Sequence, residues 1–144
     1  MKKIILSIVV SFLLLIGYKS VAQVYIYFEG VNGERKFAAF PSSTQINSFQ
    51  WGASNSAAGN VGSGRAGAGK VQLNDLTFTK LRGSASSALQ MFVFNGKVIP
   101  KAELRFYRSG AAPEYLTIKL EEVLITSWSI STDGEAPTES FSLK

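Results

Sequence analysis

The sequence predicts a mainly β protein, a small antiparallel β-barrel of two sheets with one α-helix at about residues 84–95. Short segments of alternating apolar and polar residues recur along the chain between turn residues, which is typical of antiparallel strands. One segment has instead the 3.6-residue period of an amphipathic helix. A two-sheet sandwich without a ligand cavity is the alternative, because periodicity does not give strand order.

The first two strands are predicted at residues 24–30 (VYIYFEG) and 45–52 (QINSFQWG). In the first segment the aliphatic residues and Phe28 share one face while the tyrosines share the other, as expected for a strand with one buried side. In the second segment Phe49 and Trp51 share a face. Each segment ends in glycine, which favours a turn.

A long glycine-rich loop is predicted next. Six glycines lie between Gly52 and Gly69 among small residues, and this composition buries too little apolar surface to form a regular element alone. A strand follows at Val71–Lys80, where the alternation slips phase between Leu73 and Leu76. The slip predicts a bulge, or a strand with apolar neighbours on both faces.

One helix is predicted after residue 22. Its apolar residues recur at helical spacing, and they are Ala85, Ala88, Leu89, Phe92 and Val93. Ser84 or Ser87 is expected to cap the N-terminus, and Ser87 with Gln90 resembles a capping box. Gly96 supplies the left-handed residue that ends many helices.

Three more strands are predicted before the end of the chain, at residues 102–108, 115–130 and 140–144. The middle segment is long and is interrupted by Glu122, so it is expected to bend there. Its core-facing residues are expected to be Leu116, Ile118, Leu120, Leu124, Trp128 and Ile130. In the last strand, Phe141 and Leu143 share a face.

The N-terminus has the pattern of a secretory signal peptide. Lys2 and Lys3 precede an apolar run at residues 4–17, and small residues follow up to Ala22. The alternative is a transmembrane anchor, but the apolar run is shorter than the roughly 20 residues that a membrane-spanning helix needs. We therefore expect cleavage between Ala22 and Gln23 and no stable membrane anchor afterwards.

Cleavage would leave one domain, residues 23–144, that is secreted or periplasmic in a bacterium. Removal of residues 1–22 takes three lysines and lowers the net charge from +5 to +2, which argues against a nucleic-acid partner. The chain has no cysteine, so its stability cannot come from disulfides.

The composition also argues against an enzyme or a metal site. Without histidine or cysteine there is no Ser-His-Asp triad, no His- or thiolate-bound zinc and no cysteine nucleophile. Glu121 and Glu122 are the only adjacent acids, and on a strand they would point to opposite faces. No catalytic residue, metal ligand or cofactor is predicted, and a hydrolase using Ser or carboxylate groups is the least favoured alternative.

The stretch GSGRAGAGKV, residues 62–71, matches two nucleotide-binding patterns, G-x-G-x-x-G and G-x-x-x-x-G-K. The first pattern needs a helix directly after the glycines, but the following residues alternate like a strand. The second needs Ser or Thr after the lysine, whereas Val71 follows Lys70. Both matches fail in context, so no nucleotide cofactor is expected.

The chain resembles the Hcp family, the hemolysin-coregulated proteins of bacterial type VI secretion. The resemblance runs over residues 24–144 and is carried by IYFEGVNGE, INSFQWGASN, GAGKVQLNDLTFTK, NGKVIPKAEL, EYLTIKLEEVLITSWSIS and PTESFSLK. It implies a compact barrel of two sheets with one helix. It further implies homo-hexameric rings that stack into a hollow tube, with effector proteins carried in the lumen.

In such assemblies the glycine-rich loop reaches neighbouring protomers or rings. The resemblance therefore implies a protomer interface at Gly64, Arg65, Gly67, Gly69 and Lys70, where glycine lets two backbones approach closely. A loop that is only mobile is the alternative.

Aromatic side chains are a second candidate for the contact face. These rings are Tyr25, Tyr27, Trp51, Tyr107 and Trp128. For Trp51 and Trp128 we favour burial in the core, because large aromatic residues are usually well buried.

Two features depart from the family pattern. Tube-forming members lack a signal peptide, and their last strand continues beyond SFSLK, which suggests a fragment or a short closing strand with a frayed sheet edge. An exported Hcp-like barrel that binds a ligand or protein independently of a secretion machine is therefore the alternative function.

Overall fold

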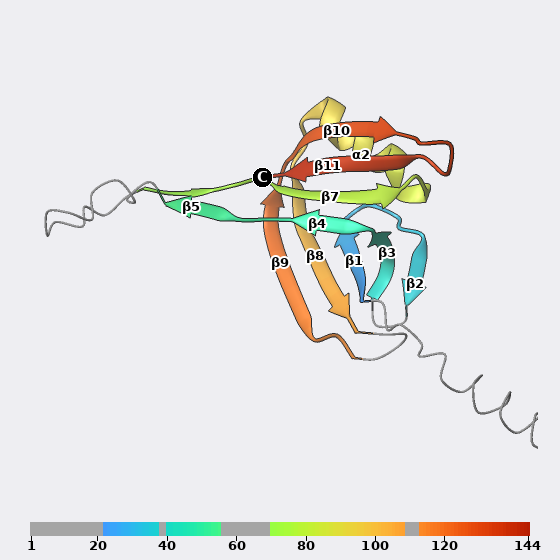
Figure 1. Cartoon of the computed structure of the whole chain (residues 1–144), viewed down its shortest axis with the longest axis horizontal. Helices are drawn as coiled ribbons and strands as arrows, with labels where there is room; N and C mark the ends of the chain where they lie inside the picture. The colour runs from blue at the N-terminus through green and yellow to red at the C-terminus, as the bar shows by residue number, and fades with distance from the viewer. Residues whose placement is uncertain (1–21, 38–39, 56–69, 109–112) are drawn as a thin grey trace, which may run out of the picture.

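Two antiparallel sheets and a projecting two-stranded ribbon make up the fold (Figure 1). The computed structural model describes residues 22–37, 40–55, 70–108 and 113–144. The first sheet contains, in spatial order, β2 (Arg35–Phe37), β3 (Phe40–Ile46), β1 (Gln23–Phe28), β8 (Ile99–Tyr107) and β9 (Leu116–Val123). The second contains β10 (Ile125–Ser131), β11 (Thr138–Leu143), β7 (Leu76–Leu81) and β4 (Ser48–Gln50). The ribbon pairs β5 (Ala53–Asn55) with β6 (Val71–Leu73).

Two long strands close these sheets into a barrel. The chain passes from β3 to β4 through Asn47, and from β9 to β10 through Leu124, and each time it leaves the first sheet for the second. Each corner strand thus belongs to both sheets, which is how small barrels turn their corners. Over the described residues, the structure confirms the predicted barrel of two sheets with one helix.

Aromatic residues from both sheets fill the centre of the barrel. The Phe78 ring stacks on Phe141 at a centroid distance of 5.4 Å and meets Phe28 of the opposite sheet at 6.0 Å. All three side chains are buried, as are Ile26 and Leu104. The core-facing sides predicted for residues 102–108 and for the last strand are therefore confirmed. In the first strand Ile26 and Phe28 are buried as expected, but Tyr25 of the opposite face is buried as well.

The predicted bend at Glu122 is confirmed, but Leu124, directly after the bend region, was assigned to the wrong face. Trp128, opposite the buried Phe141, packs against the core as expected. Glu122 has a left-handed backbone, with φ 53°, and such a residue shifts the alternation of the strand. After the shift Val123 and Ile125 are buried, whereas Leu124 is half-buried and Ile130 is exposed.

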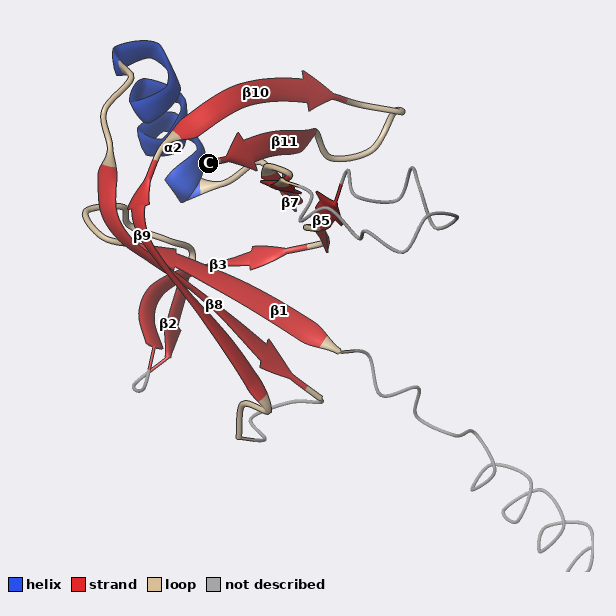
Figure 2. Cartoon of the chain, turned by 90° about the vertical axis from the view of Figure 1, so that its left-hand side faces the viewer, coloured by secondary structure: helices blue, strands red, loops and turns tan. Residues whose placement is uncertain are grey.

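The helix α2 (Ser84–Asn95) has the predicted bounds and packs against β10 (Figure 2). Gly96 ends it in the left-handed conformation, with φ 60°, as expected. The predicted caps are wrong: Gly83 is the N-cap residue, and its backbone N–H donates to Ser86 Oγ at 2.9 Å. Gln90 is not part of a capping box, since its amide donates to a carboxylate of β11 at 3.0 Å.

Two predicted strands are each divided in the structure. The segment 45–52 spans the end of β3 and all of β4, and β3 begins earlier than expected, at Phe40. The segment 71–80 is divided into β6 and β7 by Asn74 and Asp75. The phase slip that predicted a bulge marks the point where the chain leaves the barrel.

Candidate assembly surface

The β5–β6 arm, residues 51–55 and 70–75, projects from one end of the barrel (Figure 1). Its strands pair antiparallel, and the Asn74 N–H donates to the Gly52 carbonyl at 2.9 Å. Trp51, Val71 and Leu73 on the arm are 48%, 57% and 66% exposed. A two-stranded ribbon with exposed apolar residues is marginally stable in water and is typical of a contact surface.

Lys70, the one described residue of the five predicted in the glycine-rich loop, is exposed directly before β6. Gly64, Arg65, Gly67 and Gly69 lie outside the described residues. The interface role of these five residues therefore stays a prediction.

The two tryptophans differ from one another. Trp51 is exposed on the arm, so the expectation that it belongs to the core is wrong for this residue. Trp128 is half-buried against the core and lies edge-on to the exposed Phe94 ring at 6.2 Å. The phase slip before β7 marks where residues 71–73 leave the barrel, but alternation gives no such signal at Trp51, which shares its parity with Phe49.

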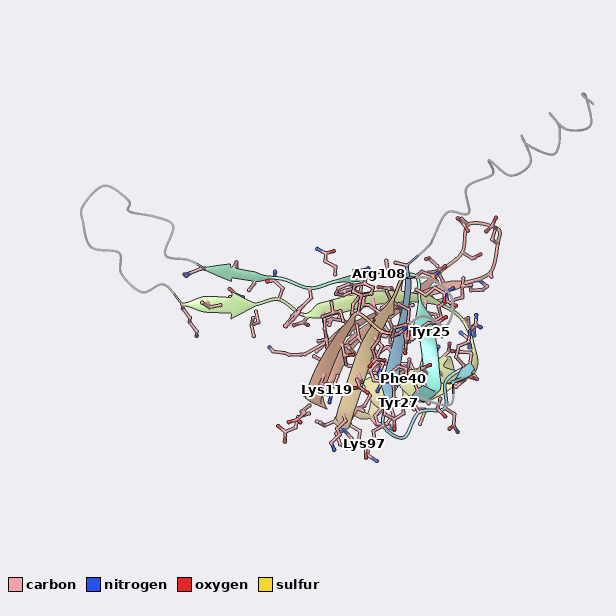
Figure 3. The ribbon with its side chains drawn as sticks, turned by 90° about the horizontal axis from the view of Figure 1, so that it is seen from below. Tyr25, Tyr27, Phe40, Lys97, Arg108 and Lys119 are labelled. Atoms are coloured by element: carbon pink, nitrogen blue, oxygen red, sulfur yellow. The ribbon has the colours of Figure 1, made fainter. Side chains whose placement is uncertain are left out.

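The outer face of the first sheet carries an aromatic and cationic layer that sequence reasoning did not detect (Figure 3). The Arg105 guanidinium lies 4.1 Å from the Phe40 ring centre, and Tyr27 meets Phe40 at 5.8 Å. Burial alone would lower the pKa of Arg105, but ion pairs with Glu103 at 3.1 Å and Glu114 at 3.3 Å outweigh it, so the pKa is raised.

Next to this layer, β8 and β9 present opposite charges side by side. Lys101 pairs across the strands with Glu121, and Glu103 pairs with Lys119. These four side chains and Tyr27 line a shallow pocket of about 270 Å³. Opposite charges at facing positions stabilise a sheet. Because they cancel, this surface has little net charge that could attract a strongly charged partner.

A buried ionic cluster fastens α2 to the second sheet. Lys80 of β7 and Glu139 of β11 are directly opposite each other in the sheet, both fully buried, with Nζ 3.6 Å from the carboxylate. Ser86 of α2 accepts a hydrogen bond from Lys80 Nζ at 3.0 Å and donates one to Glu139. Each charge is thus paired and hydrogen-bonded, which is what burial of charge requires.

Glu34 joins this cluster at the start of α2. Its carboxylate accepts a hydrogen bond from the Ala85 N–H at 3.2 Å and lies 3.6 Å from Lys80 Nζ. Partial burial would raise the pKa of Glu34, but hydrogen bonds from backbone amides and Thr44, together with Lys80, lower it below its usual value. The residues of this cluster hold the helix against the sheet, and none of them lines the two pockets that border β9.

Neither a metal centre nor a membrane span is found in the part of the chain that the structure describes. Its Asp and Glu residues do not come together in any group of three that could hold an ion. Its one helix is too short and too polar to cross a membrane.

The fold is shared with proteins of bacterial type VI secretion. A solved type six secretion system protein is 25% identical and superposes with a TM-score of 0.78, covering 86% of this chain and 79% of that one. Hcp1 from Salmonella typhimurium, 23% identical, superposes at 0.71 over 85% of this chain and 81% of that one.

Residues 25–144 match the family described as type VI secretion system effector, Hcp, and the chain belongs to this family. Protein hcp1 of Pseudomonas aeruginosa is 40% identical over 67 residues, 45% of this chain. The match spans 40% of that protein's length. Membership confirms the predicted resemblance and assigns the chain to a non-enzymatic, structural class of secretion proteins.

Proposed function

We propose that this chain is a ring-forming tube protein of type VI secretion, with six protomers in a ring, rings that stack, and effector proteins carried in the lumen. The observation that supports self-association is the arm, which extends apolar side chains away from the barrel that could bury them. Burying a valine or leucine completely contributes roughly 1.5–3 kcal/mol, so a few such contacts repeated around a ring add up. Closed rings use this surface without open-ended growth.

The test is the oligomeric state of the chain from Gln23 onward. Size-exclusion chromatography with light scattering and negative-stain microscopy should show rings. Val71→Lys places a charge on the arm and should shift the population to monomer. Met91→Lys, at an exposed apolar residue of α2 away from the arm, is the matched control and should leave rings intact. Monomers at high concentration in the unaltered chain would contradict the proposal.

We further propose that the chain is exported, with residues 1–22 removed, to the periplasm or the medium. The N-terminal pattern of lysines and an apolar run supports this step. N-terminal sequencing of the exported protein should then begin at Gln23. A protein that keeps Met1 would contradict cleavage without bearing on ring formation.

The same leader favours the second candidate, an exported barrel that binds a partner independently of a contractile machine. Export from a strain that lacks the machine separates the two functions. Release that needs the machine supports the tube protein. Release that needs only the leader supports the independent binding module.

A further inference from the structure

A polar pocket of about 270 Å³ lies between β2, the end of β3 and the end of β7. Figure 1 shows β2 and the end of β7 on the side of the barrel opposite the arm. The pocket is lined by Glu34, Arg35, Gln45, Asn47, Leu81 and Arg82. Two arginines and two residues with amide side chains therefore border the same small space.

Arg35 is a cation of this pocket that has no carboxylate partner among the described residues. Its guanidinium donates a hydrogen bond to the neutral Gln45 Oε1 at 3.2 Å. None of the ion pairs between described residues includes it. A guanidinium has five N–H donors, and the Arg35 side chain is exposed, so most of these donors are available to a ligand.

Arg82 brings a second guanidinium that is only partly used. Its side chain is 47% exposed, and it pairs with Glu139 at 3.4 Å. The buried Lys80 also pairs with Glu139, and it lies 3.6 Å from Glu34. Lys80 and Arg82 therefore balance the two carboxylates, which leaves Arg35 as one net positive charge at the pocket.

This charge balance favours a ligand with a single negative charge. A guanidinium can hold a carboxylate through two parallel hydrogen bonds, and the side-chain amides of Gln45 and Asn47 can donate to the same oxygens. A second charge on the ligand would be repelled by the Glu34 carboxylate, which also lines the pocket. Ordinary ligand pockets have volumes of about 300–1,000 Å³, so this pocket suits a small group.

We propose that the pocket between Arg35 and Arg82 binds the carboxylate of a small aliphatic acid or of the C-terminal residue of a polypeptide. Both sources present the same chemistry, which is one negative charge next to an apolar group. The carboxylate accepts hydrogen bonds from the two guanidinium groups, and the apolar group contacts Leu81, which is 49% exposed. The pocket is separate from the arm, so this proposal does not rest on ring formation.

The test is a ligand-observed NMR titration of the chain from Gln23 onward, which contains every described strand and helix. This measurement works on monomers and on rings, so its outcome is separate from that of assembly. The probe is N-acetyl-leucine, and the control probe is N-acetyl-leucine amide, which lacks the charge. We expect saturable binding of the acid and at least about tenfold weaker binding of the amide. Equal binding of the two, or tighter binding of inorganic phosphate at neutral pH, would overturn the proposal.

Arg35→Gln and Lys97→Gln form a matched pair, because each removes one positive charge from an exposed residue. Lys97 follows the C-terminus of α2, whereas the pocket residue Glu34 accepts a hydrogen bond at its N-terminus. Arg35→Gln should weaken binding of the acid at least about fivefold, and Lys97→Gln should change it less than about twofold. Equal effects would mean attraction by net charge alone and would overturn the proposal.

Two further variants test the guanidinium groups themselves. Arg35→Lys keeps the charge but loses the paired donors, so it should weaken binding about threefold. Arg82→Gln removes the second guanidinium and should also weaken binding. Affinity equal to that of the unaltered chain in either variant would overturn the proposal.

A longer probe separates the two sources of the carboxylate. It is the pentapeptide Ser-Gly-Ser-Gly-Leu with a free C-terminus, and its control is the same peptide with an amidated C-terminus. Tighter binding of the free peptide than of N-acetyl-leucine assigns the pocket to a chain end, and equal or weaker binding assigns it to a small acid. Both results support a carboxylate site, whereas equal binding of the free and amidated peptides would overturn it.

Discussion

The barrel and the β5–β6 arm are made from the same strands but have opposite environments. β4 and β7 pair inside the barrel, where Phe78 is fully buried, and their continuations pair in the arm, where Leu73 is 66% exposed. Apolar residues stabilise the barrel by packing within one chain, whereas the same kind of residue on the arm gains nothing until another surface covers it. The difference separates the part of the molecule that packs its apolar residues within one chain from the part that leaves them exposed.

The largest expected effect comes from breaking the barrel at its centre. Phe78→Ala removes the ring that stacks on Phe141 and should lower the free energy of unfolding by about 3–5 kcal/mol. Val71→Thr on the arm should change it by less than about 0.5 kcal/mol, because the side chain is exposed. Urea unfolding of both variants in the monomeric state measures the contrast, and equal losses would contradict it.

Disrupting the buried ionic cluster should lower the free energy of unfolding by a similar or smaller amount. Glu139→Leu removes the one fully buried carboxylate beside the buried Lys80, leaving it only the partly exposed Glu34, and should cost about 3–5 kcal/mol. The double variant with Lys80→Met removes both charges and should recover part of the loss. Urea unfolding of the single and double variants tests this coupling. A double variant that is no more stable than Glu139→Leu alone would mean that the cluster does not act through its charges.

A smaller loss is expected at the start of α2, where Gly83 makes room for Glu34. A methyl group on Gly83 would lie 2.1 Å from Glu34 Oε1, so Gly83→Ala must displace the carboxylate that accepts the Ala85 N–H. Losing a hydrogen bond that caps a helix N-terminus lowers the free energy of unfolding by about 0.5–2 kcal/mol. Thermal unfolding should show this loss in the unaltered background and little further loss when Glu34 is already alanine, because the side chain that the methyl group displaces is then absent.

The smallest effect is a dependence on pH. The folded pKa of Glu34 lies below its ordinary value of 4.5, so the carboxylate stabilises the fold above that pH and loses this contribution as the pH falls through the folded pKa. The stability advantage of the unaltered chain over Glu34→Gln should therefore shrink below about pH 4.5. Parallel urea titrations measure it, and a constant difference across that range would contradict the assignment.

Local patterns predicted the barrel well because its strands and helix follow simple periods. The bounds of α2 and the buried faces of β1, β8 and β11 follow from alternation and helical spacing alone. The buried residues at the barrel corners were harder to predict. The left-handed backbone at Glu122 shifts the alternation, so that Val123 and Ile125 are buried in place of Leu124. Nothing in the residue type announces that shift, since a glutamate rarely adopts such a conformation.

The ionic cluster had a signal in the sequence that went unused. Lys80 shares its parity with Leu76 and Phe78, and Glu139 shares its parity with Phe141, so both charges occupy core-facing positions. Only the register of β7 against β11 shows that they meet. Strand order is a long-range property, so periodicity could not give the pairing, the pocket between Arg35 and Arg82 or the exposure of Trp51.

The continuity of β5 with β4 and of β6 with β7 has a mechanical consequence. A pull on the arm runs lengthwise along β4 and β7, and it loads the hydrogen bonds of β7 to β4 and β11 together in shear. Bonds that share a load fail only as a group, so tension from a neighbour would reach the body of the barrel before any strand peels away.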